Sequence, residues 1–72
     1  MDVNLTATMK RALRHADLEA GTLPRIFPDH GDEIHEGTIT AMIKRELVWR
    51  DGPTIFLTDS GREEAQRLQA ER

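Results

Sequence analysis

The side chains best suited to bind a metal ion, or to change charge near neutral pH, are gathered in residues 28–37. This run holds two histidines and four carboxylates: Asp29, His30, Asp32, Glu33, His35 and Glu36. Imidazole and carboxylate groups suit a divalent ion, but their spacing here fits no established ligand pattern, so we predict a solvated acidic loop without a metal or other cofactor. A pH-responsive role for the histidines, docking of a basic partner and mimicry of phosphate charge stay open. If the loop binds a protein, we expect its contacts to include Asp32, Glu33 and Glu36.

The aromatic side chains Trp49 and Phe56 lie on either side of an Asp-Gly pair that favours a tight turn. In a hairpin, strand parity places both on one face, opposite the aliphatic side chains Val48, Ile55 and Leu57. Exposed paired aromatics are typical of an interface, so we predict that Trp49 and Phe56 contact a protein partner or a second copy of the chain. The alternative is that an apolar side chain of residues 22–27 covers them: Leu23, Ile26 or Phe27.

Residues that would support covalent catalysis are scarce. The chain has no cysteine, and Ser60 belongs to a predicted helix start. It also lacks a glycine-rich phosphate loop and a nucleophile elbow. We therefore expect a protein that is not an enzyme.

Length and charge limit what these side chains can be part of. A chain of 72 residues predicts a single domain, residues 1–72, whose small core would gain stability from a dimer because no disulfide is available. No apolar run approaches the roughly 18 residues of a membrane span, and the first four residues do not resemble a signal peptide, so we expect a cytoplasmic protein without a membrane partner. The net charge is -3, and every charged side chain between residues 28 and 42 is acidic. Any DNA-binding hypothesis must answer this, since phosphate contacts require cations.

Apolar side chains recur every three or four residues in two segments, and this spacing predicts two amphipathic helices. The first covers about residues 6–16 with Thr6 as its cap, and its inward side chains are Met9, Ala12, Leu13 and Ala16. The second covers about residues 38–46, with inward side chains Ile39, Met42, Ile43 and Leu47. Between them, two prolines confine residues 22–27 to a short edge strand, and residues 28–37 form the loop.

A hairpin over about residues 47–58 follows the second helix. A two-residue turn at Asp51-Gly52 places Arg50 opposite Pro53, Trp49 opposite Thr54 and Val48 opposite Ile55. A closing helix over about residues 59–70 begins after Thr58, a good capping residue followed by acids that suit the positive end of a helix dipole. The expected fold is therefore α+β, with three helices and a two- or three-stranded antiparallel sheet.

The order of these helices and strands, and the residue sequences of two segments, resemble those of winged helix-turn-helix proteins. Residues 43–48, Ile-Lys-Arg-Glu-Leu-Val, are similar to the end of a recognition helix that leads into the wing. Residues 56–62, Phe-Leu-Thr-Asp-Ser-Gly-Arg, are similar to the return strand and closing-helix start of bacterial regulators and related small phage or actinobacterial proteins. The chain departs from the family at Glu46, where glycine is frequent. It also departs at Pro28 and Gly31, which reduce to a turn the helix that normally braces the recognition helix.

The resemblance implies double-stranded DNA as the partner and transcription regulation as the role. The second helix would enter the major groove with Thr38, Thr40, Lys44 and Arg45, and Arg50 at the wing would touch a phosphate or the minor groove. The competing hypothesis is a winged helix that binds and modulates a protein partner through the acidic loop and the wing.

Overall fold

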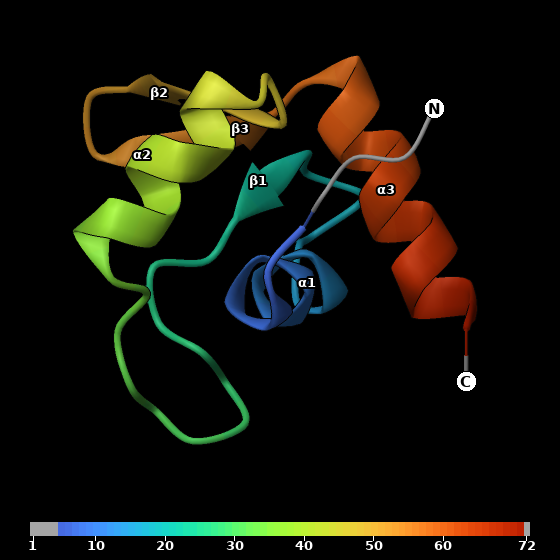
Figure 1. The fold of residues 1–72 in the computed structure, drawn as a ribbon, viewed down its shortest axis with the longest axis horizontal. Helices are drawn as coiled ribbons and strands as arrows, with labels where there is room; N and C mark the ends of the chain where they lie inside the picture. The colour runs from blue at the N-terminus through green and yellow to red at the C-terminus, as the bar shows by residue number, and fades with distance from the viewer. Residues whose placement is uncertain (1–4, 72) are drawn as a thin grey trace.

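The structure, a computed structural model, describes residues 5–71. Along this part of the chain the elements are α1 (Ala7–Arg14), β1 (Thr22–Leu23), α2 (Glu36–Lys44), β2 (Val48–Asp51), β3 (Thr54–Leu57) and α3 (Asp59–Ala70). The strands form one antiparallel sheet in the order β1-β3-β2. In Figure 1 the hairpin of β2 and β3 lies at the top beside α2, α3 descends on the right, and α1 is seen along its axis below β1. The predicted α+β architecture of three helices and a small antiparallel sheet is confirmed.

The first helix is shorter than predicted, although its cap is the expected one. The Thr6 side chain accepts a hydrogen bond from the backbone N–H of Met9, and the helix ends at Arg14 with His15 as its C-cap. Residues 17–21 then form a turn in which the Asp17 side chain accepts from the N–H groups of Glu19 and Ala20. This turn brings the chain back into β1, where Thr22 pairs with Phe56 of β3.

Helix α2 begins and ends two residues before the predicted bounds of 38–46. It starts earlier because His35 caps it: its Nδ1 accepts from the N–H of Gly37 at 3.1 Å. It ends earlier because Glu46 takes a left-handed conformation, with φ of 61°. The N–H groups of Glu46 and Leu47 then bond back to the carbonyls of Ile43 and Met42, at 2.9 and 3.0 Å, which is the Schellman way of ending a helix.

The predicted turn of the hairpin was wrong by one position. Asp51 pairs with Thr54, so the turn consists of Gly52 and Pro53. The expected pairing of Arg50 with Pro53 required a backbone donor that proline lacks. Gly52, with φ of 61°, instead supplies the positive φ that a type II′ turn needs at its first central residue. In the observed register the partner of each β2 residue lies two positions further along β3 than predicted. Because side chains alternate between faces, each side chain stays on the face that was predicted for it.

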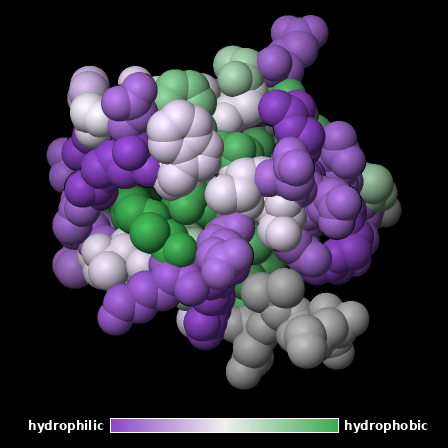
Figure 2. Space-filling view, turned by 90° about the horizontal axis from the view of Figure 1, so that it is seen from above, coloured by the Kyte–Doolittle hydropathy of each residue, from purple (hydrophilic) through white to green (hydrophobic). Residues whose placement is uncertain are grey.

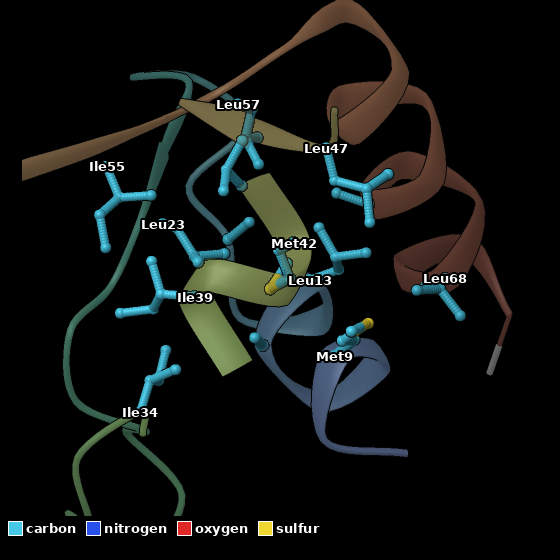
Figure 3. Close-up of a cluster of buried hydrophobic side chains, with 14 of the residues drawn as sticks. Met9, Leu13, Leu23, Ile34, Ile39, Met42, Leu47, Ile55, Leu57 and Leu68 are labelled. Atoms are coloured by element: carbon cyan, nitrogen blue, oxygen red, sulfur yellow. The ribbon is translucent and has the colours of Figure 1, made fainter. Parts of the chain in front are cut away.

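The hydrophobic core lies between the three helices and one face of the sheet (Figure 3). Buried side chains come from every element; those labelled in the figure are Met9, Leu13, Leu23, Ile34, Ile39, Met42, Leu47, Ile55, Leu57 and Leu68. One predicted inward residue, Ile43, is 37% exposed, because it lies at the border of the buried face of α2. Among the described residues, no helix has the length and apolar character to cross a bilayer.

Candidate nucleic-acid interface

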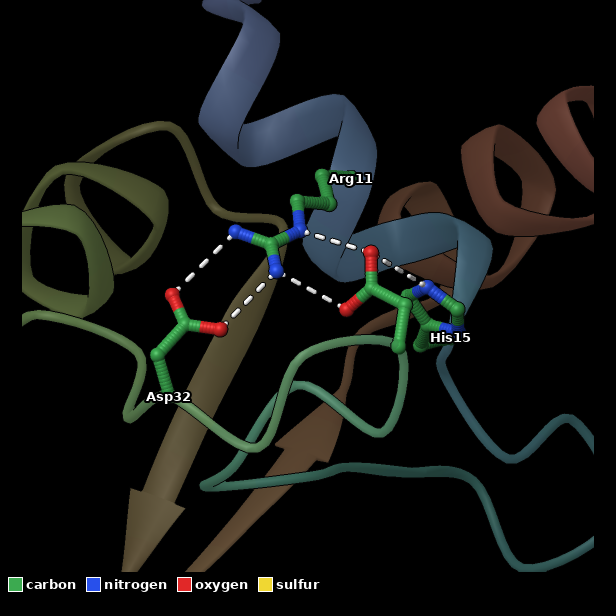
Figure 4. A network of polar contacts seen from close by, with 4 residues as sticks. Arg11, His15 and Asp32 are labelled. Atoms are coloured by element: carbon green, nitrogen blue, oxygen red, sulfur yellow. Dashed lines mark hydrogen bonds and ion pairs between the residues drawn. The ribbon is translucent and has the colours of Figure 1, made fainter.

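The loop between β1 and α2 is fastened to α1 by one arginine. The guanidinium of Arg11 donates to both carboxylate oxygens of Asp29, at 2.8 and 3.0 Å, and to both of Asp32, at 2.9 and 3.3 Å. Figure 4 shows Arg11 with Asp32 on one side and, on the other, the Asp29 carboxylate, which also lies 3.6 Å from Nε2 of His15. The guanidinium carbon of Arg11 also lies 3.7 Å from the centre of the buried Phe27 ring, which makes a cation–π contact. Arg11 therefore fastens the loop to α1 at two positions, Asp29 and Asp32.

Arg11, Asp29 and Asp32 form a clamp in which the single positive charge of Arg11 offsets one of the two negative charges. Hydrogen bonding to Arg11 lowers the pKa of Asp29 to about 2, and the same contact lowers the pKa of Asp32. Hydrogen bonds to these two carboxylates raise the pKa of Arg11 above its ordinary range. Both acids are therefore ionised and paired at neutral pH. Asp32, predicted as a partner contact, lies in an ion pair within the molecule.

A second ion pair joins two residues that were assigned to different partners. Arg50, predicted to touch DNA, donates from a terminal guanidinium nitrogen to a carboxylate oxygen of Glu36, predicted to touch a protein. That hydrogen bond is the largest cause of the lowered pKa of Glu36. Arg50 lies on β2 and Glu36 is the first residue of α2, so the pair connects the hairpin to the start of α2.

The outward face of α2 has a different character. Thr40, Lys44 and Arg45 are exposed, whereas Thr38 is half-buried. Neither Lys44 nor Arg45 takes part in an ion pair within residues 5–71. Three of the four predicted base or phosphate contacts on this helix are therefore open to solvent, and the two cations among them are available to an anion.

The C-terminal end of α2 is held by the segment that follows the hairpin. The Thr58 hydroxyl donates to the carbonyl of Glu46, and the Thr58 N–H donates to the carbonyl of Leu47 at 3.0 Å. The same hydroxyl accepts from the N–H of Gly61 at 3.0 Å and caps α3. Gly61 lies so close to Leu47 that an added Cβ would stand 1.8 Å from its carbonyl oxygen. These contacts join the residues that follow α2 to the start of α3.

The outer face of the sheet carries the predicted aromatic pair. Trp49 and Phe56 face each other across β2 and β3, and their rings stack with centres 4.7 Å apart. Trp49 is 48% exposed. The segment expected as a possible cover does not serve as one, because Leu23 and Phe27 are buried in the core and Ile26 is 52% exposed. Figure 2 looks onto the side where β2 and β3 lie and shows apolar and near-neutral atoms surrounded by hydrophilic ones.

A surface hollow of about 590 Å³ lies where the loop meets the start of α2. Its lining includes Glu33, the predicted partner contact that forms no ion pair within the described residues, and the exposed Ile26. Sequence reasoning missed the role of Arg25 in this region, where its guanidinium donates to the carbonyl of Pro53 at 3.1 Å. No local pattern marks a contact between residues so far apart in the chain.

Sequence reasoning also assigned no contact within the molecule to Arg11 or Arg62. Arg62 donates to the carbonyl of Leu18 at 2.6 Å and so ties α3 to the turn after α1. For Arg62 the signal was its place in the motif at residues 56–62. Arg11 gives no such signal, since its two partners are 18 and 21 residues away.

Within residues 5–71, histidine and acidic side chains form no group of three or more that is arranged to hold a metal ion. No family model, curated protein or solved structure matches the chain.

Proposed function

We propose that this protein is a small, non-enzymatic winged-helix protein that binds double-stranded DNA and regulates transcription, in the manner of small bacterial or phage regulators. The observation that carries the proposal is the outward face of α2, where Thr40, Lys44 and Arg45 are exposed and both cations lack an internal carboxylate partner among the described residues. An α-helix fits the major groove, and arginine and lysine donate to phosphate oxygens and guanine edges there.

The distribution of ion pairs answers the objection from net charge. Three of the four acids between residues 28 and 42 are paired inside the molecule: Asp29 and Asp32 share the single positive charge of Arg11, and Glu36 pairs with Arg50. The field beside α2 is therefore less negative than the sequence alone indicates. Because phosphate contacts are local, two unpaired cations on an exposed helix can supply affinity in a protein of net charge -3.

The test is fluorescence anisotropy with a labelled random-sequence duplex at rising salt concentration. We expect wild-type binding to weaken steadily with salt. The double variant Lys44→Gln/Arg45→Gln should bind more weakly and should flatten the slope of log affinity against log salt by about two, since each lost phosphate contact removes roughly 0.9.

The matched control is Lys10→Gln/Arg14→Gln, which removes the same charge from α1. It should change the slope much less than the α2 variant. Absence of salt-sensitive binding by the wild type, or equal effects of the two double variants, would reject the assignment of α2 as the DNA-binding element.

A second candidate function has its own observation, the exposed Trp49 stacked on Phe56. Under this hypothesis the outer face of the sheet binds a protein or a second copy of the chain. Light scattering coupled to size exclusion tests self-association directly. A concentration-dependent dimer that Trp49→Ala abolishes would favour this candidate, whereas a monomer at all concentrations would argue against a second copy as the partner.

A further inference from the structure

The ion pair between Arg50 and Glu36 lies in the open. The two side chains are 38% and 60% exposed, and Arg50 reaches Glu36 from the rim of the sheet. Exposed ion pairs of this kind contribute little to stability, because water and salt compete for both groups. The contact can therefore open without disturbing the core.

Among the described side chains, Arg50 alone donates a hydrogen bond to the Glu36 carboxylate. Two other ionisable groups act on the Glu36 carboxylate, Arg25 and His35, and both lower its pKa less than Arg50 does. Each also has its own bond: Arg25 donates to the carbonyl of Pro53, and His35 accepts from the N–H of Gly37. Arg50 has no hydrogen-bonding partner other than Glu36 among the side-chain contacts of the described residues.

We propose that Glu36 is an intramolecular competitor for Arg50: the Glu36 carboxylate occupies the Arg50 guanidinium and keeps it from a backbone phosphate when duplex DNA binds. This inference rests on the proposed function. A guanidinium presents the same planar pair of donors to carboxylate and to phosphate, so the two anions compete for Arg50 with the same geometry. Glu36 thereby lowers affinity for DNA in general and sets how many phosphates the free protein can neutralise.

The test measures the salt slope of duplex binding for Glu36→Gln. Freeing Arg50 should tighten binding several-fold at low salt and should steepen the slope of log affinity against log salt by about 0.9, the contribution of one further phosphate contact. Glu36→Ser, which is well tolerated near a helix start, should behave in the same way and covers the case in which the glutamine variant folds poorly. Circular dichroism melting checks the fold of each.

Two controls separate the competition for Arg50 from the effect of a change in overall charge. Glu64→Gln removes an equal charge from an acid that pairs with Arg67 on α3, and it should leave the slope unchanged. Adding Arg50→Gln to Glu36→Gln should return the slope to the wild-type value.

The outcomes distinguish this inference from the proposed function. If the wild type binds in a salt-sensitive way but Glu36→Gln has the slope of Glu64→Gln, the competition is refuted and DNA binding stands. If the double variant keeps the steeper slope, the gain does not pass through Arg50 and the competition is likewise refuted. If neither the wild type nor any variant binds in a salt-sensitive way, the proposed function itself fails.

Discussion

The winged-helix resemblance was drawn in part from the closing motif at residues 56–62, whereas the DNA-binding proposal rests on the outward face of α2, and the side chains of these two regions make different contacts. In the motif, the Thr58 hydroxyl contacts Glu46 and Gly61, Gly61 lies against Leu47, and Arg62 donates to Leu18. On α2, Thr40, Lys44 and Arg45 face solvent. The most specific part of the resemblance therefore explains how the hairpin is joined to the helices. Even a shared fold would not fix a shared function, so the proposed DNA contacts depend on the outward face of α2 and not on this motif.

The largest effect that separates the two regions should come from Gly61→Ala. Its new Cβ would collide with the carbonyl of Leu47 at 1.8 Å, and backbone cannot move aside cheaply. We expect a loss of about 3 kcal/mol or more in the free energy of unfolding, measured by urea denaturation. Gly52→Ala is the control: it has open space but a positive φ, so about 1 kcal/mol is expected. Equal losses would contradict the close packing at Gly61.

Two threonine variants should give opposite results. Thr58→Ala removes the cap of α3 and the bond to Glu46, so it should cost about 1–2 kcal/mol of stability and leave DNA affinity per folded molecule unchanged. Thr40→Ala should change stability by less than about 0.5 kcal/mol and weaken DNA binding. Chemical denaturation and anisotropy measure the two quantities. Loss of stability in Thr40→Ala without loss of affinity would remove it from the interface.

Glu46 lies at the junction of the two regions, and its backbone is strained. With φ of 61°, a residue that has a Cβ is disfavoured, and glycine removes the penalty. Glu46→Gly should therefore stabilise the protein by about 0.5–1 kcal/mol, seen as a higher denaturation midpoint. The exposed helical position Glu63 provides the contrast, since Glu63→Gly should destabilise by about 1 kcal/mol. A destabilised Glu46→Gly would show that the side chain itself matters.

The smallest effect concerns the clamp of Arg11, Asp29 and Asp32, which fastens the loop to α1. The pKa of Asp29 is lowered from 3.8 to about 2, so its stabilising contribution is present above pH 3.8 and is lost as the pH falls from there through about 2. Arg11→Met should move the carboxyl titration of Asp29, followed by NMR, back up toward 3.8. Lys10→Met, one residue away on α1, should leave that titration in place. An unshifted Asp29 in the Arg11 variant would rule out the clamp as the cause.

Residue patterns were sufficient for the elements and the faces but not for the contacts between them. Apolar spacing located the first two helices, because burial of one face is a local periodic signal, and the Thr58 cap located the third. It misplaced the ends of α2, where the His35 cap and the left-handed Glu46 decide the bounds. The hairpin turn was misplaced because the missing donor of Pro53 was not weighed against the Asp-Gly preference.

At the candidate site, the outward positions on α2 followed from periodicity, whereas the ion pairs did not. Arg11 meets Asp32 across 21 residues and Arg50 meets Glu36 across 14, and the meeting depends on how the loop packs on α1 and how the hairpin lies beside α2. A linear charge count therefore overstated the acidity next to the helix. Folding rearranged which charges are available without changing their sum.

The most direct test is an NMR titration of uniformly ¹⁵N-labelled protein with a random-sequence duplex, which maps the surface that DNA contacts. We expect the amide signals of α2 to shift, with the largest changes from Thr40 to Arg50 and little change in α3. The shifts should diminish as salt is added. Shifts confined to α3, or none at low salt, would contradict the assignment of α2 as the DNA-binding element.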